Sequence, residues 1–206
     1  MCALFIVFAA LLLPGVQAGE GSSAIGREST VRHGGIRFEA PPSWVASGMP
    51  RLIDNIGKIE FDAARVEKLL AESRDGSSHL ATYTSHDPRS HAGILPTINV
   101  VVRSNPRTRF DLFKRDLASS LEGMSSMFEN YMVTAPAGER MVGGLRAVSF
   151  ESEYDIRTRD GQAARIVNRT IAIPRGATFI QISMLDVAPG ENSGVFEAFL
   201  DSFAFD

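Results

Sequence analysis

The sequence predicts an α+β fold, an α/β/α sandwich with a central, mainly antiparallel β-sheet. Three observations lead to this prediction. Apolar and polar residues alternate from Val148 to Ile156, and a strand from Ile166 to Ile173 returns after the turn residues Asp160-Gly161. Apolar residues at helical spacing run from Phe113 to Phe128. An aromatic stripe from Val195 to Phe203 closes the chain as a helix that must dock on the sheet.

The amino terminus has the pattern of a signal peptide over residues 1–18. Ala3–Leu13 is an apolar run that Pro14 ends, and Val16-Gln17-Ala18 places small residues before a cleavage point at Gly19. The run is shorter than the roughly 20 residues of a membrane-spanning helix, and it lacks the polar face of a buried core helix. No Lys or Arg precedes it. We therefore expect an exported protein, periplasmic or secreted, without a membrane span after signal cleavage.

The mature chain is expected to contain a flexible leader over residues 19–33 and a single domain over residues 34–206. The leader is rich in Gly and Ser, and no similar stretch, charge block or repeat divides the rest. The lone cysteine, Cys2, is removed with the signal, so an exported domain without disulfides depends on its own core. A formal net charge of −3 argues against a nucleic-acid-binding surface, which needs a strong basic excess.

Three strands are predicted in the first half of the domain. Gly35–Glu39 alternates apolar and polar residues and stops at Pro41-Pro42. A strand near Leu80–Thr84 precedes a loop rich in His, Pro and Gly. Thr97–Arg103 is a β-branched run typical of a buried strand.

Two helices are predicted in this part of the chain, one before the strand near Leu80–Thr84 and one after the strand Thr97–Arg103. Asp62 caps the first, which ends at Asp75-Gly76 and carries three apolar residues on one face: Val66, Leu69 and Leu70. Thr108 and Asp111 stand at the cap and N3 positions of the second, a weak capping box. Its buried face has spacings of three and four: Phe113, Leu117, Leu121, Met124 and Phe128. Met124, Met127 and Met132 could form a soft ligand-binding surface, but helical spacing beside Phe128 favours a core role.

An acidic row lies on one face of the strand before the turn at Asp160-Gly161: Glu151, Glu153 and Asp155. It could be a cation site or a pair of acid/base carboxylates. Keeping the apolar residues of both strands on one face requires an odd loop with Gly161 in the left-handed conformation. That register places Arg165 opposite Asp155 and Arg169 opposite Glu151, which favours a salt-bridged, solvated face.

The chain then turns at Pro174-Arg175-Gly176 into a last predicted strand, Thr178–Leu185. Ile180 and Ile182 lie on one side of this strand. The closing helix carries a wide apolar stripe: Val195, Phe196, Phe199, Leu200 and Phe203.

Several of these segments resemble the PsbP-like superfamily. Gly35–Trp44, Gly-Ile-Arg-Phe-Glu-Ala-Pro-Pro-Ser-Trp, is similar to the opening strand of that family, which runs into Pro and Trp. Thr97–Arg103 is similar to its central strand, Val142–Ala147 to its Gly-x-x-Ala strand entry, and Phe199–Phe203 to its terminal helix ending in Ser-Phe. The resemblance spans residues 34–206. It implies an α/β/α sandwich around an antiparallel sheet, no enzymatic activity, and action by binding partners.

A histidine-containing loop offers candidate metal ligands. Three of the four histidines lie in one strand and the loop after it, with an aspartate beside them: His79, His86, His91 and Asp87. Neutral imidazoles and a carboxylate suit a zinc or copper ion. The spacing matches no established metal motif, and Asp87-Pro88 is also ordinary turn chemistry. A surface loop without metal is the alternative interpretation.

The sequence contains no catalytic or cofactor signature. Gly19–Ala24 matches the letters of the dinucleotide fingerprint but has no strand before it, and no phosphate loop, nucleophile elbow or paired-cysteine motif occurs. We therefore expect no cofactor and no enzymatic activity.

The leading hypothesis is an exported, non-catalytic accessory domain that binds a protein partner in the cell envelope at a sheet edge or at the histidine-containing loop. The alternative is a small-molecule or metal-ion binding protein, or less plausibly a hydrolase with a non-standard site.

Overall fold

The computed structural model of the protein describes residues 30–47, 78–91, 93–158 and 161–206. The predicted signal peptide, the leader up to residue 29 and the helix capped by Asp62 lie outside the described residues. No helix in the described ranges is long and apolar enough to cross a membrane.

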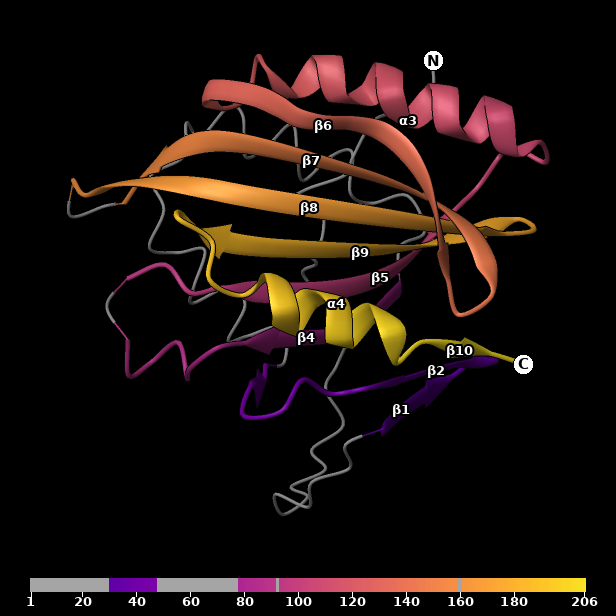
Figure 1. Cartoon of the computed structure of the whole chain (residues 1–206), viewed down its shortest axis with the longest axis horizontal. Helices are drawn as coiled ribbons and strands as arrows, with labels where there is room; N and C mark the ends of the chain where they lie inside the picture. Colours follow the sequence, from indigo (N-terminus) through magenta and orange to yellow (C-terminus); the bar gives the residue numbers. More distant parts are fainter. Residues whose placement is uncertain (1–29, 48–77, 92, 159–160) are drawn as a thin grey trace.

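A seven-stranded antiparallel sheet forms the centre of the molecule, with the strand order β3-β4-β5-β9-β8-β7-β6 (Figure 1). Its strands are β3 (Val45–Ala46), β4 (Ser78–Thr84), β5 (Thr97–Ser104), β6 (Glu129–Val142), β7 (Leu145–Arg157), β8 (Ala163–Arg175) and β9 (Thr178–Val187). The strands predicted near residues 80–84, 97–103, 148–156, 166–173 and 178–185 correspond to β4, β5, β7, β8 and β9. Strand β6 is an additional element that the sequence pattern did not predict.

A second, three-stranded sheet has the order β1-β2-β10 and joins the two ends of the described chain. It contains β1 (Thr30–His33), β2 (Ile36–Glu39) and β10 (Ala204–Phe205). Residues 30–33, which the sequence pattern assigned to the flexible leader, therefore belong to a strand. The physical reason is the turn that follows, because Gly34 and Gly35 adopt φ values of 53° and 72°. Positive φ at both central residues is the geometry of a tight hairpin turn, and glycine adopts it without strain.

Helix α3 (Phe110–Met124) covers one face of the central sheet. Its residues Phe113, Leu117 and Leu121 pack with Val148 and Phe150 of β7. All five residues of the predicted helical stripe are buried, but the helix ends at Met124, so Phe128 lies beyond it. The predicted capping box is wrong, because the N-cap residue is Arg109 and no side chain caps the helix.

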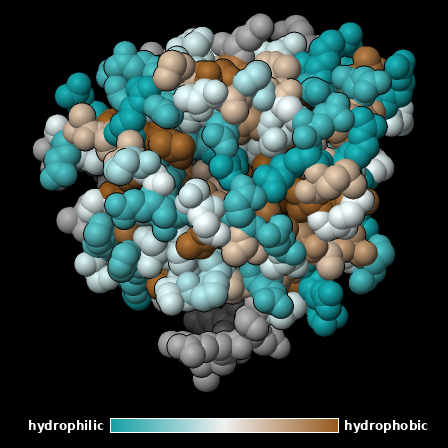
Figure 2. Space-filling view, viewed as in Figure 1, coloured by the Kyte–Doolittle hydropathy of each residue, from teal (hydrophilic) through white to brown (hydrophobic). Residues whose placement is uncertain are grey.

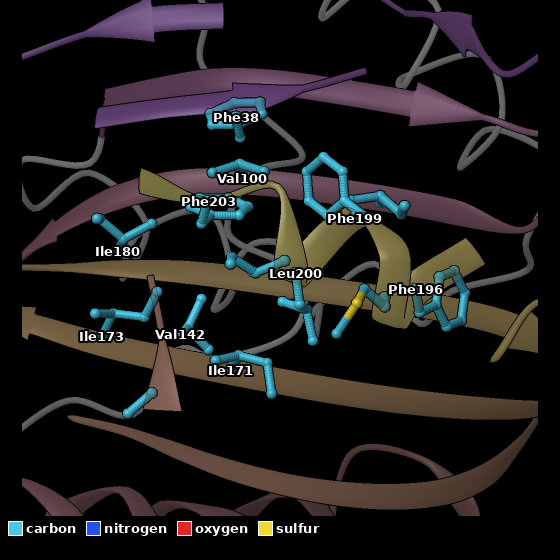
Figure 3. Close-up of a cluster of buried hydrophobic side chains, with 14 of the residues drawn as sticks. Phe38, Val100, Val142, Ile171, Ile173, Ile180, Phe196, Phe199, Leu200 and Phe203 are labelled. Carbon is cyan, nitrogen blue, oxygen red and sulfur yellow. The ribbon is translucent and has the colours of Figure 1, made fainter. Parts of the chain in front are cut away.

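Helix α4 (Ser193–Asp201) covers the opposite face together with the three-stranded sheet (Figure 3). Phe196, Phe199 and Leu200 of α4 are buried as predicted. They pack in one cluster with residues of β2, β5, β8 and β9: Phe38, Val100, Ile171, Ile173, Ile180 and Ile182. Because successive strand residues point to opposite faces, Ile171 faces α4 whereas Ala172 faces α3. The predicted α+β sandwich is confirmed.

Candidate functional site

The histidine-containing loop brings two of its three histidines together. The rings of His86 and His91, both exposed, stack with their centroids 5.5 Å apart and their planes 15° apart. His79 lies at the other end of β4, where its Nε2 is 2.7 Å from Oγ1 of Thr82. Partial burial lowers the pKa of His79. The three histidines of the sequence hypothesis therefore do not converge on one point.

Asp87 takes part in the turn chemistry of this loop. Its carboxylate accepts hydrogen bonds from the backbone N–H of Arg89 at 3.0 Å and from Nη2 of the same arginine at 2.8 Å. Within the described ranges, no group of three or more His, Cys, Asp or Glu side chains is arranged to hold a metal ion. Of the candidate ligands, only His86 and His91 are therefore placed to coordinate a metal at this loop.

The acidic row of β7 (Glu151, Glu153 and Asp155) is paired with arginines as its register predicted. Asp155 lies opposite Arg165 and Glu151 opposite Arg169, with Gly161 of the connecting loop at a φ of 82°. Arg165 donates to Glu153 at 3.2 Å and to Asp155 at 3.0 Å. Arg169 donates to Glu151 at 2.6 Å. The salt-bridged interpretation of the acidic row is confirmed.

Two residues from distant parts of the chain extend this network. Glu197 of α4 accepts from Arg169 of β8 and, at 2.9 Å, from Arg140 of β6. The Arg140 guanidinium is the main cause of a lowered pKa at Glu197. The pKa of Asp155 is lowered by the amide of Asn130 first and by Arg165 second. Carboxylates held in the charged form by arginines and an amide are poor proton carriers near neutral pH, so the network is structural.

The sheet face beneath α3 carries a polar row that crosses four neighbouring strands. Its members lie directly opposite one another: Thr82 of β4, Asn99 of β5, Ser183 of β9 and Thr170 of β8. The Thr82 hydroxyl donates to Oδ1 of Asn99 at 2.8 Å. Gln181 donates to Ser183 at 3.0 Å, and Asn168 donates to Thr170 at 3.2 Å. We name this the polar face, and the face beneath α4 the apolar face.

Several polar atoms of the polar face are buried without a hydrogen-bond partner in the described part of the chain. They include Oη of Tyr154, Oδ1 of Asn168 and Nε of Arg103. Burial lowers the pKa of Arg103 to about 10, and it raises the pKa of Tyr154 far above its ordinary value. Such atoms cost free energy, so the polar face is not optimised for stability alone. Sequence reasoning missed this face, because its members are ordinary strand residues that only the register brings together.

Strand β6 forms one edge of the central sheet, and in the described residues it pairs with β7 alone. Three large apolar side chains on it are exposed: Met132 at 50%, Val133 at 39% and Met141 at 58%. Met124 is buried and Met127 packs against the core, as the sequence predicted, but the prediction of a core role was wrong for Met132. The outer surface on the side of the molecule that carries α4 differs from the β6 edge, because hydrophilic and hydrophobic residues are interspersed over it (Figure 2).

No protein-family model matches the sequence, and no curated protein matches it. Among solved structures, the chain is similar to cyanobacterial PsbP (CyanoP) from Synechocystis sp. PCC 6803, at 13% identity and a TM-score of 0.50, over 91% of this chain and 99% of that one. It is also similar to LpqN, involved in cell envelope biogenesis of Mycobacterium tuberculosis, at 12% identity and a TM-score of 0.46, over 82% of each chain. A third similar structure is PA94, a protein of unknown function from Pseudomonas aeruginosa, at 12% identity and a TM-score of 0.40, over 52% of this chain and 71% of that one. The likeness to cyanobacterial PsbP confirms the resemblance at the level of the fold.

Proposed function

Because the chain has a PsbP-like fold, we propose that it is an exported, non-catalytic accessory domain that binds a protein partner of the cell envelope at the outer edge of β6. The observation that carries this proposal is the exposure of Met132 and Val133 on an edge strand. An unpaired strand edge offers a row of backbone N–H and C=O groups to an added strand. Flexible methionine side chains suit an adaptable apolar contact.

The contact is restricted to the first half of β6. The pairing of β6 with β7 is irregular between Glu129 and Met132 and again around Ala135 and Gly138. Pro136 also removes one backbone donor from the edge. Bulges and proline are devices that protect a strand edge against pairing, so the accessible stretch is the part between these irregularities, Met132 and Val133. The partner therefore supplies a short extended segment with apolar side chains.

Site-specific photo-crosslinking tests this contact. A photoreactive amino acid at Val133 should give one reproducible adduct in whole cells, and Met132→Lys should weaken that adduct severalfold. Met141→Lys is the matched control, because Met141 is the same residue type on the same strand, is similarly exposed, and lies beyond Pro136. Equal effects of both lysine substitutions, or an adduct unchanged by Met132→Lys, would refute the edge contact.

Export and domain organisation can be tested on the full-length chain. We infer cleavage after Ala18 and a folded domain that includes residues 34–206 and extends back to Thr30. Mass spectrometry of the protein recovered from the periplasm or medium should show Gly19 as its first residue. A protein that keeps residues 1–18 and stays in the cytoplasm would contradict export.

A second candidate function is divalent-cation binding at His86 and His91, favoured by the stacking of their rings. Zinc or copper could take both imidazoles after a small rotation of either side chain. Tag-free protein would then bind a stoichiometric metal, and His86→Ala with His91→Ala would abolish that binding, whereas His33→Ala would not. Unchanged metal affinity in the double variant would exclude this site.

A further inference from the structure

A cleft of about 580 Å³ opens at one end of the central sheet, on the apolar face. It lies between the β1–β2 hairpin, represented by His33, Gly34 and Ile36, and the ends of strands β4, β5, β7, β8 and β9. Its volume is in the range of small-molecule sites, which is about 300–1,000 Å³. No part of it belongs to the β6 edge, the acidic row or the histidine-containing loop.

The floor of the cleft is apolar and its rim is polar. Five apolar side chains line it: Ile36, Val102, Leu145, Pro174 and Ile180. The polar lining comes from His33, Ser78, Arg175 and Thr178. An apolar floor with a few convergent polar groups is the usual composition of a site for an organic ligand.

Arg175 is oriented at this rim by main-chain oxygens from both ends of the described chain. Its Nη1 donates to the main-chain oxygens of Gly34 and Gly35, both at 3.3 Å, and its Nη2 to that of Asp206 at 3.5 Å. The guanidinium also lies 5.4 Å from the centre of the Phe205 ring. No described carboxylate side chain forms an ion pair with Arg175.

Two N–H groups of Arg175 remain available. A guanidinium carries five N–H donors, and the three hydrogen bonds to main-chain oxygens leave the Nε–H and one Nη2–H without an acceptor in the described residues. Both nitrogens are bonded to the same carbon, a spacing that suits two oxygens of one carboxylate or phosphate. The fixed orientation reduces the entropy lost when such an anion binds.

We propose that this cleft binds a small organic anion, with its carboxylate or phosphate group on Arg175 and its apolar body on Ile36, Val102 and Ile180. Both head groups offer the same chemistry to the guanidinium, namely paired anionic oxygens. An apolar body would cover the apolar side chains of the floor, whereas an inorganic ion would leave them exposed to solvent. Thr178 and Ser78 at the rim supply hydroxyls for a second oxygen-bearing group.

Titration with octanoate, octyl phosphate and octan-1-ol, followed by backbone amide NMR shifts, tests the site. Both anions should shift the amides of Gly34, Gly176 and Thr178, and the tighter of the two identifies the head group. Octan-1-ol should bind at least about tenfold more weakly, because it cannot form the charge-assisted pair. Arg175→Gln should lower the affinity for the better anion about tenfold and leave that for octan-1-ol unchanged. Arg115→Gln, on the exposed side of α3, is the control and should change neither.

A second variant covers the case in which Arg175→Gln disturbs the hairpin. Thr178→Phe places a ring at the rim from an exposed strand position, where an aromatic residue is well tolerated. It should lower the affinity for all three probes while circular dichroism stays unchanged. Equal binding of octanoate and octan-1-ol, or shifts elsewhere than in the cleft, would overturn the proposal.

Discussion

On the face of the central sheet that α4 covers, one core cluster consists of apolar side chains, whereas the face that α3 covers carries a polar row across four of the same strands. In β9 the contrast falls on neighbouring residues, since Ile182 faces α4 and Ser183 belongs to the polar row. The two faces also differ in whether their charged side chains are paired. At the margin of the apolar face, Glu197 and Arg169 are paired, whereas Nε of Arg103 on the polar face is buried without an acceptor in the described residues.

This difference indicates that the two faces contribute unequally to stability. Burial of apolar area is the main favourable term in folding, and the apolar face concentrates it. A hydrogen-bonded pair of polar groups on a buried face contributes only about 0.5–1.5 kcal/mol, and a buried polar group without a partner destabilises the fold. The apolar face should therefore account for most of the free energy of unfolding, and substitutions on the polar face should include some that increase it.

The largest effect is expected from Phe199→Ala on the apolar face. Phe199 is 2% exposed and packs edge-on against Phe38, Tyr83 and Phe203. Removing a buried phenylalanine costs about 3–5 kcal/mol, which urea unfolding would measure. Ser183→Ala on the polar face is the comparison and should cost less, about 1–2 kcal/mol, because it removes the acceptor of the Gln181 amide. A loss from Phe199→Ala no larger than that from Ser183→Ala would contradict the unequal division.

Arg103→Met should increase the free energy of unfolding by about 1–2 kcal/mol. The substitution removes a half-buried cation whose Nε is buried without an acceptor in the described residues, and it keeps an apolar stem of similar length. Arg157→Met, at an exposed position at the end of β7, is the matched control and should stay within about 0.5 kcal/mol of the native value. Thermal and urea unfolding would measure both. Destabilisation by Arg103→Met would mean that the guanidinium is held by a partner in the folded protein.

A smaller gain, about 1 kcal/mol, is expected from Tyr154→Phe. The Tyr154 hydroxyl is buried without a partner in the described residues, and phenylalanine keeps the ring that packs on Phe128. Tyr83→Phe applies the same change on the apolar face and should alter stability by no more than about 0.5 kcal/mol. Urea unfolding of both variants at pH 7 gives the comparison. A loss of stability in Tyr154→Phe would show that this hydroxyl has a partner in the folded protein.

Local pattern was sufficient to predict the hairpin of β7 and β8. The alternation from Val148 to Ile156 determines which residues face the core, and Gly161 supplies the positive φ that an odd loop requires. The register followed, and with it the pairs of Arg165 with Asp155 and of Arg169 with Glu151. In such a hairpin the paired residues are close in sequence, so the local alternation and the turn residues are enough to determine which residues pair.

Strand β6 could not be predicted from the same kind of pattern. Its pairing shifts at several points between Glu129 and Gly138, so its residues do not alternate regularly between buried and exposed. Pro136 argues against a strand unless the segment lies at an edge, and edge position is a property of the tertiary fold. The exposure of Met132 therefore became visible only in the structure.

The remaining site residues lacked a sequence signal for a similar reason. Arg175 meets Gly34 and Gly35 from more than a hundred residues away, and the polar row takes one member from each of four strands. Single Ser, Thr, Asn or Arg residues in strands are common, so no spacing distinguishes these positions. His79 shows the converse, because the length of β4 separates it from its sequence neighbours His86 and His91.

The smallest effect is expected from Glu197→Gln, which removes the carboxylate that joins α4 to Arg140 and Arg169 at the margin of the apolar face. The Glu197 side chain is 45% exposed, so solvent screening limits the cost at pH 7 to about 0.5 kcal/mol. The pH dependence has a definite sign. Because the pKa of Glu197 is lowered by Arg140 first, its stabilisation is complete above the ordinary glutamate pKa and is lost as the pH falls through the lower folded value. Wild type and Glu197→Gln should therefore differ at pH 7 and converge once the pH has fallen below the folded pKa of Glu197, whereas Glu191→Gln, at an exposed position before α4, should match wild type throughout. A difference that persists after Glu197 is protonated would mean that Glu197 stabilises α4 by packing, and that the charges at this margin contribute no more to stability than the buried polar atoms beneath α3.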